Sequence, residues 1–94
     1  MFVPTGFSPN NDGFNDVLSV HGQSNITVTY FRIYDRWGEA VFVANEFSVN
    51  DPAVFWDGMF RGQQLNAGVY TWIMEVRYID QQREIFKGNT TLMK

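Results

Sequence analysis

Hydrophobic and polar residues alternate along most of this chain, and such alternation is typical of β-strands that bury one face. The runs with this character cover residues 2–7, 17–21, 26–35, 39–44, 69–78 and 84–93, and a short strand or turn begins at Trp56. Turn-forming residues separate the runs, and no stretch has a convincing helical period. Proline cannot donate to a ladder, so Pro4 makes the first run an edge strand or one that switches sheets, whereas residues 45–55 are expected to be irregular.

The buried face of the later strands can be assigned from their alternation. In the run 69–78 the inward side chains are Tyr70, Trp72, Met74, Val76 and Tyr78. In the run 84–93 the inner face holds Phe86, Thr90 and Leu92. The run 26–35 changes parity along its length, and we expect a bulge near Tyr30.

One motif narrows the fold class. Leu65, Gly68 and Tyr70 have the spacing of the tyrosine corner of Greek-key sandwiches, in which the tyrosine hydroxyl bonds the backbone a few residues upstream. Together with the strand pattern, this motif predicts an immunoglobulin-like antiparallel β-sandwich of about seven strands. The 94 residues suffice for a single domain with its own core.

The stretch from Ile33 to Phe42 reads as strand, turn and strand. Arg36, Trp37 and Gly38 make the reversal, because glycine is favoured where a tight hairpin needs a positive φ. We expect the carboxylates near the turns to accept hydrogen bonds there rather than to form a catalytic pair. These carboxylates are Asp35, Glu39 and Asp57.

Composition excludes several functions. The net charge is −3 and the only lysines are Lys87 and Lys94, so no basic patch for nucleic acid is available. The absence of cysteine excludes disulfides and thiolate sites, and no apolar run is long enough to span a membrane. No signal peptide is visible at the start of the chain. We expect residues 1–94 to be one domain cut from a longer protein.

No catalytic constellation can be assembled, so we predict that the chain is not an enzyme. His21 is the only histidine and occupies an ordinary strand position, which favours a surface or structural role. The best ligand site is an oxygen-rich loop containing Asn10, Asp12 and Asp16, with Gly13 at a bend. Oxygen donors at alternate positions suit Ca²⁺, but no terminal glutamate or flanking helix completes the motif. The alternative is a loop of Asx-turns without metal, so Ca²⁺ is the only cofactor considered.

The three tryptophans offer a second binding hypothesis. Trp72 faces inward in its strand and is assigned to the core. Trp37 and Trp56 lie near turns, where each either covers an end of the core or forms part of a sugar-stacking platform. We favour the core for both.

Five segments form a recognisable series along the chain. They are FSPNNDGFND (7–16), IYDRWGEAVF (33–42), WDG with GQ (56–58 and 62–63), LNAGVY (65–70) and KGNTTLMK (87–94). In this order they resemble the motifs of the gliding-motility-associated C-terminal domain family, which comprises the type B sorting domains of the type IX secretion system of Bacteroidetes. The residues that carry the structural part of the resemblance are Asp12, Gly13, Asp16, Trp56, Asp57, Gly58, Gly68 and Tyr70. Small departures are Ser8, Asn11, Asn66, Ala67 and Thr90.

The resemblance implies a secretion signal. It implies that a cargo, in some members a gliding adhesin, reaches the periplasm and is then exported to the cell surface or medium. The implied partners are the type IX outer-membrane translocon and a PorP/SprF-type outer-membrane protein. We expect recognition through an exterior surface or an added strand, with Arg36, Trp37, Gly38, Thr91, Leu92 and Lys94 as candidate contacts. The alternative is a calcium-dependent carbohydrate-binding or adhesion module.

Overall fold

The computed structural model describes residues 3, 6–7, 17–23, 25–51 and 53–93. Within these residues the chain forms seven β-strands and no helix, which confirms the all-β prediction. The strands are β1 (Gly6–Phe7), β2 (Thr27–Tyr34), β3 (Ala40–Ser48), β4 (Met59–Phe60), β5 (Gln63–Gln64), β6 (Gly68–Arg77) and β7 (Arg83–Leu92). Five of them form one sheet in the order β1-β7-β6-β2-β3, and β4 pairs with β5 in a small second sheet.

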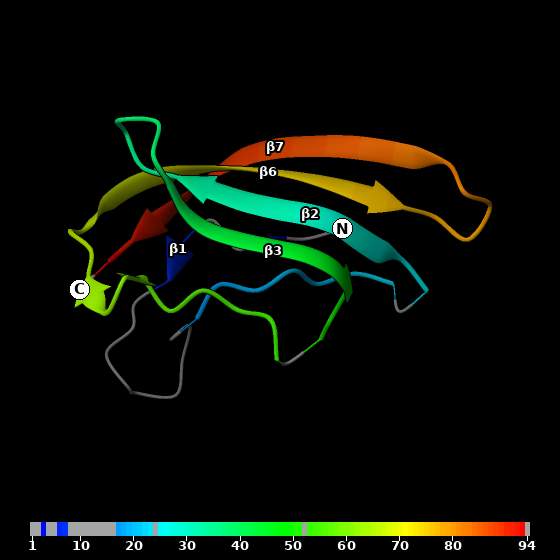
Figure 1. Cartoon of the computed structure of the whole chain (residues 1–94), viewed down its shortest axis with the longest axis horizontal. Coiled ribbons are helices and arrows are strands. Elements are labelled where there is room, and N and C mark those ends of the chain that lie inside the picture. Colours follow the sequence, from blue (N-terminus) through cyan, green and yellow to red (C-terminus); the bar gives the residue numbers. More distant parts are fainter. Residues whose placement is uncertain (1–2, 4–5, 8–16, 24, 52, 94) are drawn as a thin grey trace.

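The fold is sandwich-like, with the large sheet as one layer and less regular chain as the other (Figure 1). Adjacent strands in the large sheet are antiparallel except for one pair. β1 runs parallel to β7, with Gly6 opposite Thr91 and Phe7 opposite Leu92. The sheet is therefore mixed, whereas the sequence predicted a purely antiparallel arrangement.

The predicted faces of the long strands are confirmed. Met74 and Val76 of β6 are buried, as are Thr90 and Leu92 of β7. The register between β2 and β6 shifts between Val28 and Tyr30, which places the bulge where the change of parity indicated it.

β3 forms one edge of the large sheet and is longer than expected. It continues to Ser48 through residues that were predicted to be irregular, because 45–48 pair with the start of β2. Its regularity is broken twice. The register with β2 shifts beside Val41, and Glu46 has a left-handed φ of 49°. Such irregularities discourage edge-to-edge pairing with another chain.

The second layer contains the segment 17–21, which was predicted to be a strand. That prediction is wrong, although its alternation is right, because Leu18 and Val20 are buried. Leu18 and Trp56 form an antiparallel bridge through two backbone hydrogen bonds of 2.8 and 2.9 Å. The backbone N–H of Asn50 donates to the carbonyl of Val20 at 3.1 Å. The segment 17–21 is thus held by isolated bonds instead of a ladder.

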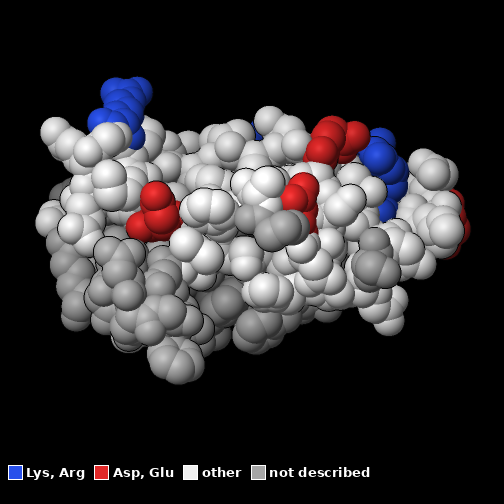
Figure 2. Space-filling view, turned by 90° about the horizontal axis from the view of Figure 1, so that it is seen from below, with Lys and Arg blue, Asp and Glu red and all other residues white. Residues whose placement is uncertain are grey.

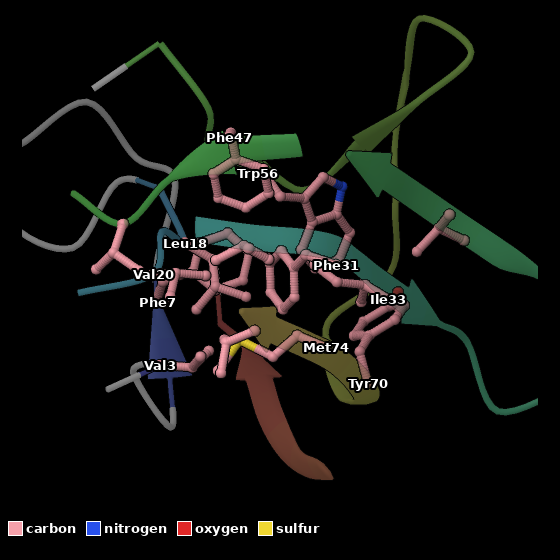
Figure 3. Packing of buried hydrophobic residues seen from close by; sticks show 14 of the residues in the cluster. Val3, Phe7, Leu18, Val20, Phe31, Ile33, Phe47, Trp56, Tyr70 and Met74 are labelled. Atoms are coloured by element: carbon pink, nitrogen blue, oxygen red, sulfur yellow. The ribbon is translucent and has the colours of Figure 1, made fainter. Parts of the chain in front are cut away.

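The core lies between the two layers and is rich in aromatic rings (Figure 3). Trp56 is only 1% exposed and packs against Phe7 and Tyr70, with ring centroids 5.3 and 5.2 Å away. The prediction that Trp56 belongs to the core is confirmed. The buried apolar residues are Val3, Phe7, Leu18, Val20, Ile26, Val28, Phe31, Ile33, Val41, Phe47, Val49, Trp56, Tyr70, Met74, Val76 and Leu92.

Trp72 packs against this core from β6, as predicted, with its ring 6.1 Å from that of Phe31. It lies over Gly88, its cross-strand partner on β7. A Cβ atom at Gly88 would approach the Trp72 ring to 2.6 Å, so the indole occupies the space that a side chain would need. The glycine within β7 is therefore a packing requirement of Trp72.

Candidate functional site

The turn between β2 and β3 projects from the end of the large sheet (Figure 1). Backbone hydrogen bonds close it at two places: the Asp35 N–H donates to the Glu39 carbonyl at 3.0 Å, and the Gly38 N–H donates to the Asp35 carbonyl at 3.1 Å. Gly38 has a φ of 84°, in the left-handed region that favours glycine. The predicted role of this glycine is confirmed.

The Asp35 carboxylate stabilises the turn from inside. Its Oδ1 atom accepts hydrogen bonds of 2.9 Å from the backbone N–H groups of both Trp37 and Glu39. Asp57 makes a similar but single contact, accepting from the Met59 N–H at 3.1 Å. Both carboxylates serve turns, as expected for Asp residues in these positions.

Trp37 stands at the tip of this turn with its ring in solvent. Its side chain is 82% exposed, so the prediction that it covers an end of the core is wrong. The Arg36 guanidinium lies over the indole, 5.5 Å from the ring centroid. Within the part of the chain that the structure describes, Arg36 forms no ion pair with a carboxylate. The tip therefore presents an aromatic ring and an unneutralised cation on a hydrogen-bonded turn.

A groove of about 170 Å³ lies beside the tip and is called the tip groove here. One wall is the turn residues 35–37, and the other is the segment 65–70 that leads into β6. The second wall is held by the tyrosine corner, in which the Tyr70 hydroxyl donates to the Asn66 carbonyl at 2.7 Å. This bond confirms the predicted motif.

The charges of the turn act on that tyrosine. Burial raises the pKa of the Tyr70 hydroxyl above its usual 10.0. The nearby Asp35 carboxylate raises this pKa further, and the Arg36 guanidinium opposes the rise. The turn and the tyrosine corner are therefore close enough to interact electrostatically across the tip groove.

The candidate contacts in the last strand have different environments in the structure. They are Thr91, Leu92 and Lys94. Thr91 lies on the outer face of β7, opposite Val69, which lines the tip groove. Thr91 therefore lies next to that wall of the groove but does not line it. The Leu92 side chain is fully buried, as its inward position in the strand predicted, and Lys94 lies outside the described residues.

The last strand also offers less backbone than expected. At Thr91 and Leu92, β7 pairs with β6 on one side and with β1 on the other. An added strand has no unpaired edge to join at these two residues.

The motif residues of the resemblance take structural positions where they are described. Gly58 is buried with a φ of 82° beside the buried Trp56, and Gly68 begins β6 with a φ of 156°. Asp12, Gly13 and Asp16 lie outside the described residues, as does Asn10, so the predicted Ca²⁺ loop stays a prediction. In the described segments there is no group of three or more His, Asp or Glu side chains that could hold a metal ion.

His21 is exposed, and its Nε2 atom lies within hydrogen-bond distance of the Ser19 hydroxyl, at 3.0 Å. This position agrees with the surface role predicted for it.

The second wall of the tip groove was not identified from the sequence. Leu65, Ala67 and Val69 supply its apolar surface. Val69 carried a usable signal, because it is an apolar residue on the outward face of an alternating strand and is 58% exposed.

Charge is sparse on the surface. The face in Figure 2 is mostly uncharged, with Lys, Arg, Asp and Glu scattered rather than gathered into a patch. The described residues form no helix long and apolar enough to cross a membrane.

Comparison with known proteins assigns the family. A search of curated proteins found no match. A family model, the CHU_C type IX secretion signal domain, matches residues 1–92, which is nearly the whole chain. The chain therefore belongs to the family of CHU_C type IX secretion signal domains.

Proposed function

We propose that this domain is a non-catalytic sorting signal that directs a larger secreted protein through the type IX outer-membrane translocon. The family membership supports export to the cell surface or medium. We further propose that the domain lies at the C-terminus of its cargo. This cargo is a surface protein such as a gliding adhesin. The partner that receives it is an outer-membrane protein of the PorP/SprF type.

The exposed side chain of Trp37 is the observation that supports recognition of this domain by a protein partner. A ring that is 82% exposed on a hydrogen-bonded turn gains free energy when a partner covers it. Trp and Arg are also enriched among the residues that contribute most to protein–protein binding. A secretion signal is read by a protein partner, and the tip offers the features that such a partner uses.

Export of a reporter tests the function directly. A signal peptide, a folded reporter protein and residues 1–94 would be joined in that order and produced in cells with an active type IX system. The reporter should appear outside the cell, and it should remain in the periplasm when the domain is omitted or the translocon is inactivated. Retention of the intact fusion in active cells would contradict the proposal.

A carbohydrate-binding module is the second candidate, because an exposed indole beside polar groups is also a sugar-stacking surface. The calcium that this alternative invokes would bind the loop of Asn10, Asp12 and Asp16. A glycan array of the isolated domain, with and without Ca²⁺, separates the candidates. The sorting function predicts no sugar binding under either condition.

A further inference from the structure

We infer that the tip groove is a socket for one apolar side chain of the partner protein, and that a carboxylate beside that side chain pairs with Arg36. This inference rests on the proposed sorting function and specifies the chemistry of the segment that reads the signal.

The size of the groove sets the size of the occupant. Its volume is about 170 Å³, which is close to the ~150 Å³ of a protein cavity that admits a benzene molecule. One aromatic ring or one branched aliphatic side chain therefore fills it. The apolar surface for this contact comes from Trp37, Leu65, Ala67, Val69 and the ring of Tyr70.

Both walls are formed before any partner arrives. The Asp35 carboxylate holds the turn through two backbone N–H groups, and the Tyr70 hydroxyl holds the opposite wall through the Asn66 carbonyl. A site that is already ordered loses little conformational entropy on binding, so more of the contact free energy appears as affinity.

Charge selects the kind of segment. Arg36 lines the groove, and among the residues described its guanidinium lies over an indole and forms no ion pair with a carboxylate. Asp35 also lines the groove, but its Oδ1 atom accepts two backbone hydrogen bonds from the turn. A carboxylate on the partner therefore complements the cation, and an arginine fork binds carboxylate in a well-defined geometry.

A matched control exists at the other end of the sheet. Ile79, in the turn between β6 and β7, is 78% exposed, which is nearly as much as Trp37. It does not line the tip groove, and Figure 1 shows that its turn lies at the opposite end of the sheet from the tip. Exposure alone therefore does not separate the two positions, whereas the groove does.

The first test fills the groove. In the reporter fusion, Ala67→Phe places a ring in the socket, and export should fall at least tenfold relative to the unchanged fusion. Ile79→Phe adds the same ring at the control turn and should leave export within twofold. Equal export of the Ala67→Phe and unchanged fusions would overturn the inference.

The second test changes charge at the exposed tip, where misfolding is not expected. Arg36→Glu should lower export at least tenfold, whereas Arg36→Lys keeps the charge and should retain more export than Arg36→Glu. Thermal unfolding should give the same midpoint for the unchanged domain and for the two Arg36 variants. Normal export by Arg36→Glu would overturn the inference even if Ala67→Phe failed to fold.

These outcomes are separable from failure of the proposed function. If the unchanged fusion is not exported, the sorting function itself is wrong. If the unchanged fusion is exported and both Ala67→Phe and Arg36→Glu are exported equally well, the domain is a sorting signal that is read at another surface.

Discussion

The turns that carry Trp37 and Trp56 have similar local sequences and opposite environments. Each tryptophan lies within two residues of a glycine with a left-handed φ, 84° for Gly38 and 82° for Gly58. Each turn also contains an aspartate that accepts backbone hydrogen bonds. Nevertheless Trp37 is 82% exposed and Trp56 is 1% exposed.

The difference lies in what each tryptophan can reach. Trp56 bridges to Leu18 through the backbone, and its indole N–H donates to the Met59 carbonyl at 3.1 Å. Its ring and its polar atom are thus both satisfied inside the fold. Trp37 sits on a hairpin that projects beyond the sheet, and the Arg36 guanidinium lies over its ring. The same residue type therefore serves stability in one turn and is available for recognition in the other.

Removing the buried indole should have the largest effect on stability. Trp56→Ala leaves a cavity between Phe7 and Tyr70, and large-to-small changes of this kind cost about 3–5 kcal/mol. Chemical denaturation of the purified domain measures the change in the free energy of unfolding. A loss below ~1 kcal/mol would mean that Trp56 is less important to the core than its burial indicates.

The two aspartates should contribute to stability in the order of the number of hydrogen bonds that each accepts. Asp35→Ala removes two charge-assisted bonds to the tip turn and should cost about 1–2 kcal/mol, whereas Asp57→Ala removes one and should cost less. Denaturation of both variants provides the comparison. A larger loss for Asp57→Ala would show that the buried turn, not the tip turn, depends more on its carboxylate.

The tyrosine corner connects the core to the tip and can be tested through its hydroxyl. Tyr70→Phe keeps the ring but removes the bond to the Asn66 carbonyl, at a cost of about 1 kcal/mol. The same variant should also reduce the loss of stability that occurs at alkaline pH. The pKa of Tyr70 is raised in the folded state, mainly by burial, so the unfolded chain loses this proton first as pH rises past 10.0.

Stability from Tyr70 is therefore present below pH 10 and decreases above it. Tyr78 also has a raised pKa, chiefly because its hydroxyl donates to Glu84 at 2.7 Å, so part of the alkaline decline should persist in Tyr70→Phe. Unfolding measured from pH 9 to pH 11 should show a smaller decline in Tyr70→Phe than in the unchanged domain. An identical decline in the two would argue against a perturbed Tyr70.

The exposed indole should have the smallest effect on stability. Trp37→Ala removes a ring that is 82% exposed, and surface changes of this kind usually alter the free energy of unfolding by about 0.5 kcal/mol or less. Export of the reporter should nevertheless be lost. A variant that is both stable and normally exported would remove Trp37 from the recognition surface.

Local pattern was enough to predict much of the sheet. The alternation in β6 and β7 gave the correct buried faces, and the change of parity in β2 located its bulge. The spacing of Leu65, Gly68 and Tyr70 gave a hydrogen bond that the structure contains. These features depend on the period of a strand or on a turn a few residues long, so neighbouring residues are enough to predict them.

Long-range pairing limited the other predictions. The extension of β3 to Ser48 depends on the length of β2 beside it, and the segment 17–21 meets Trp56 without forming a strand. The tip groove likewise joins residues 35–37 to residues 65–70. Nothing in either short segment specifies that the other lies next to it.

The sequence by itself determined that this protein is a cysteine-free β-fold with a glycine-closed hairpin, a tyrosine corner and the motifs of a secretion signal, because each of these is a local pattern. Only the tertiary structure decided which tryptophan is buried and which side chains border the groove at the tip. Burial depends on which distant segments cover a side chain, and Trp37 and Trp56 have neighbours in sequence too similar to decide it.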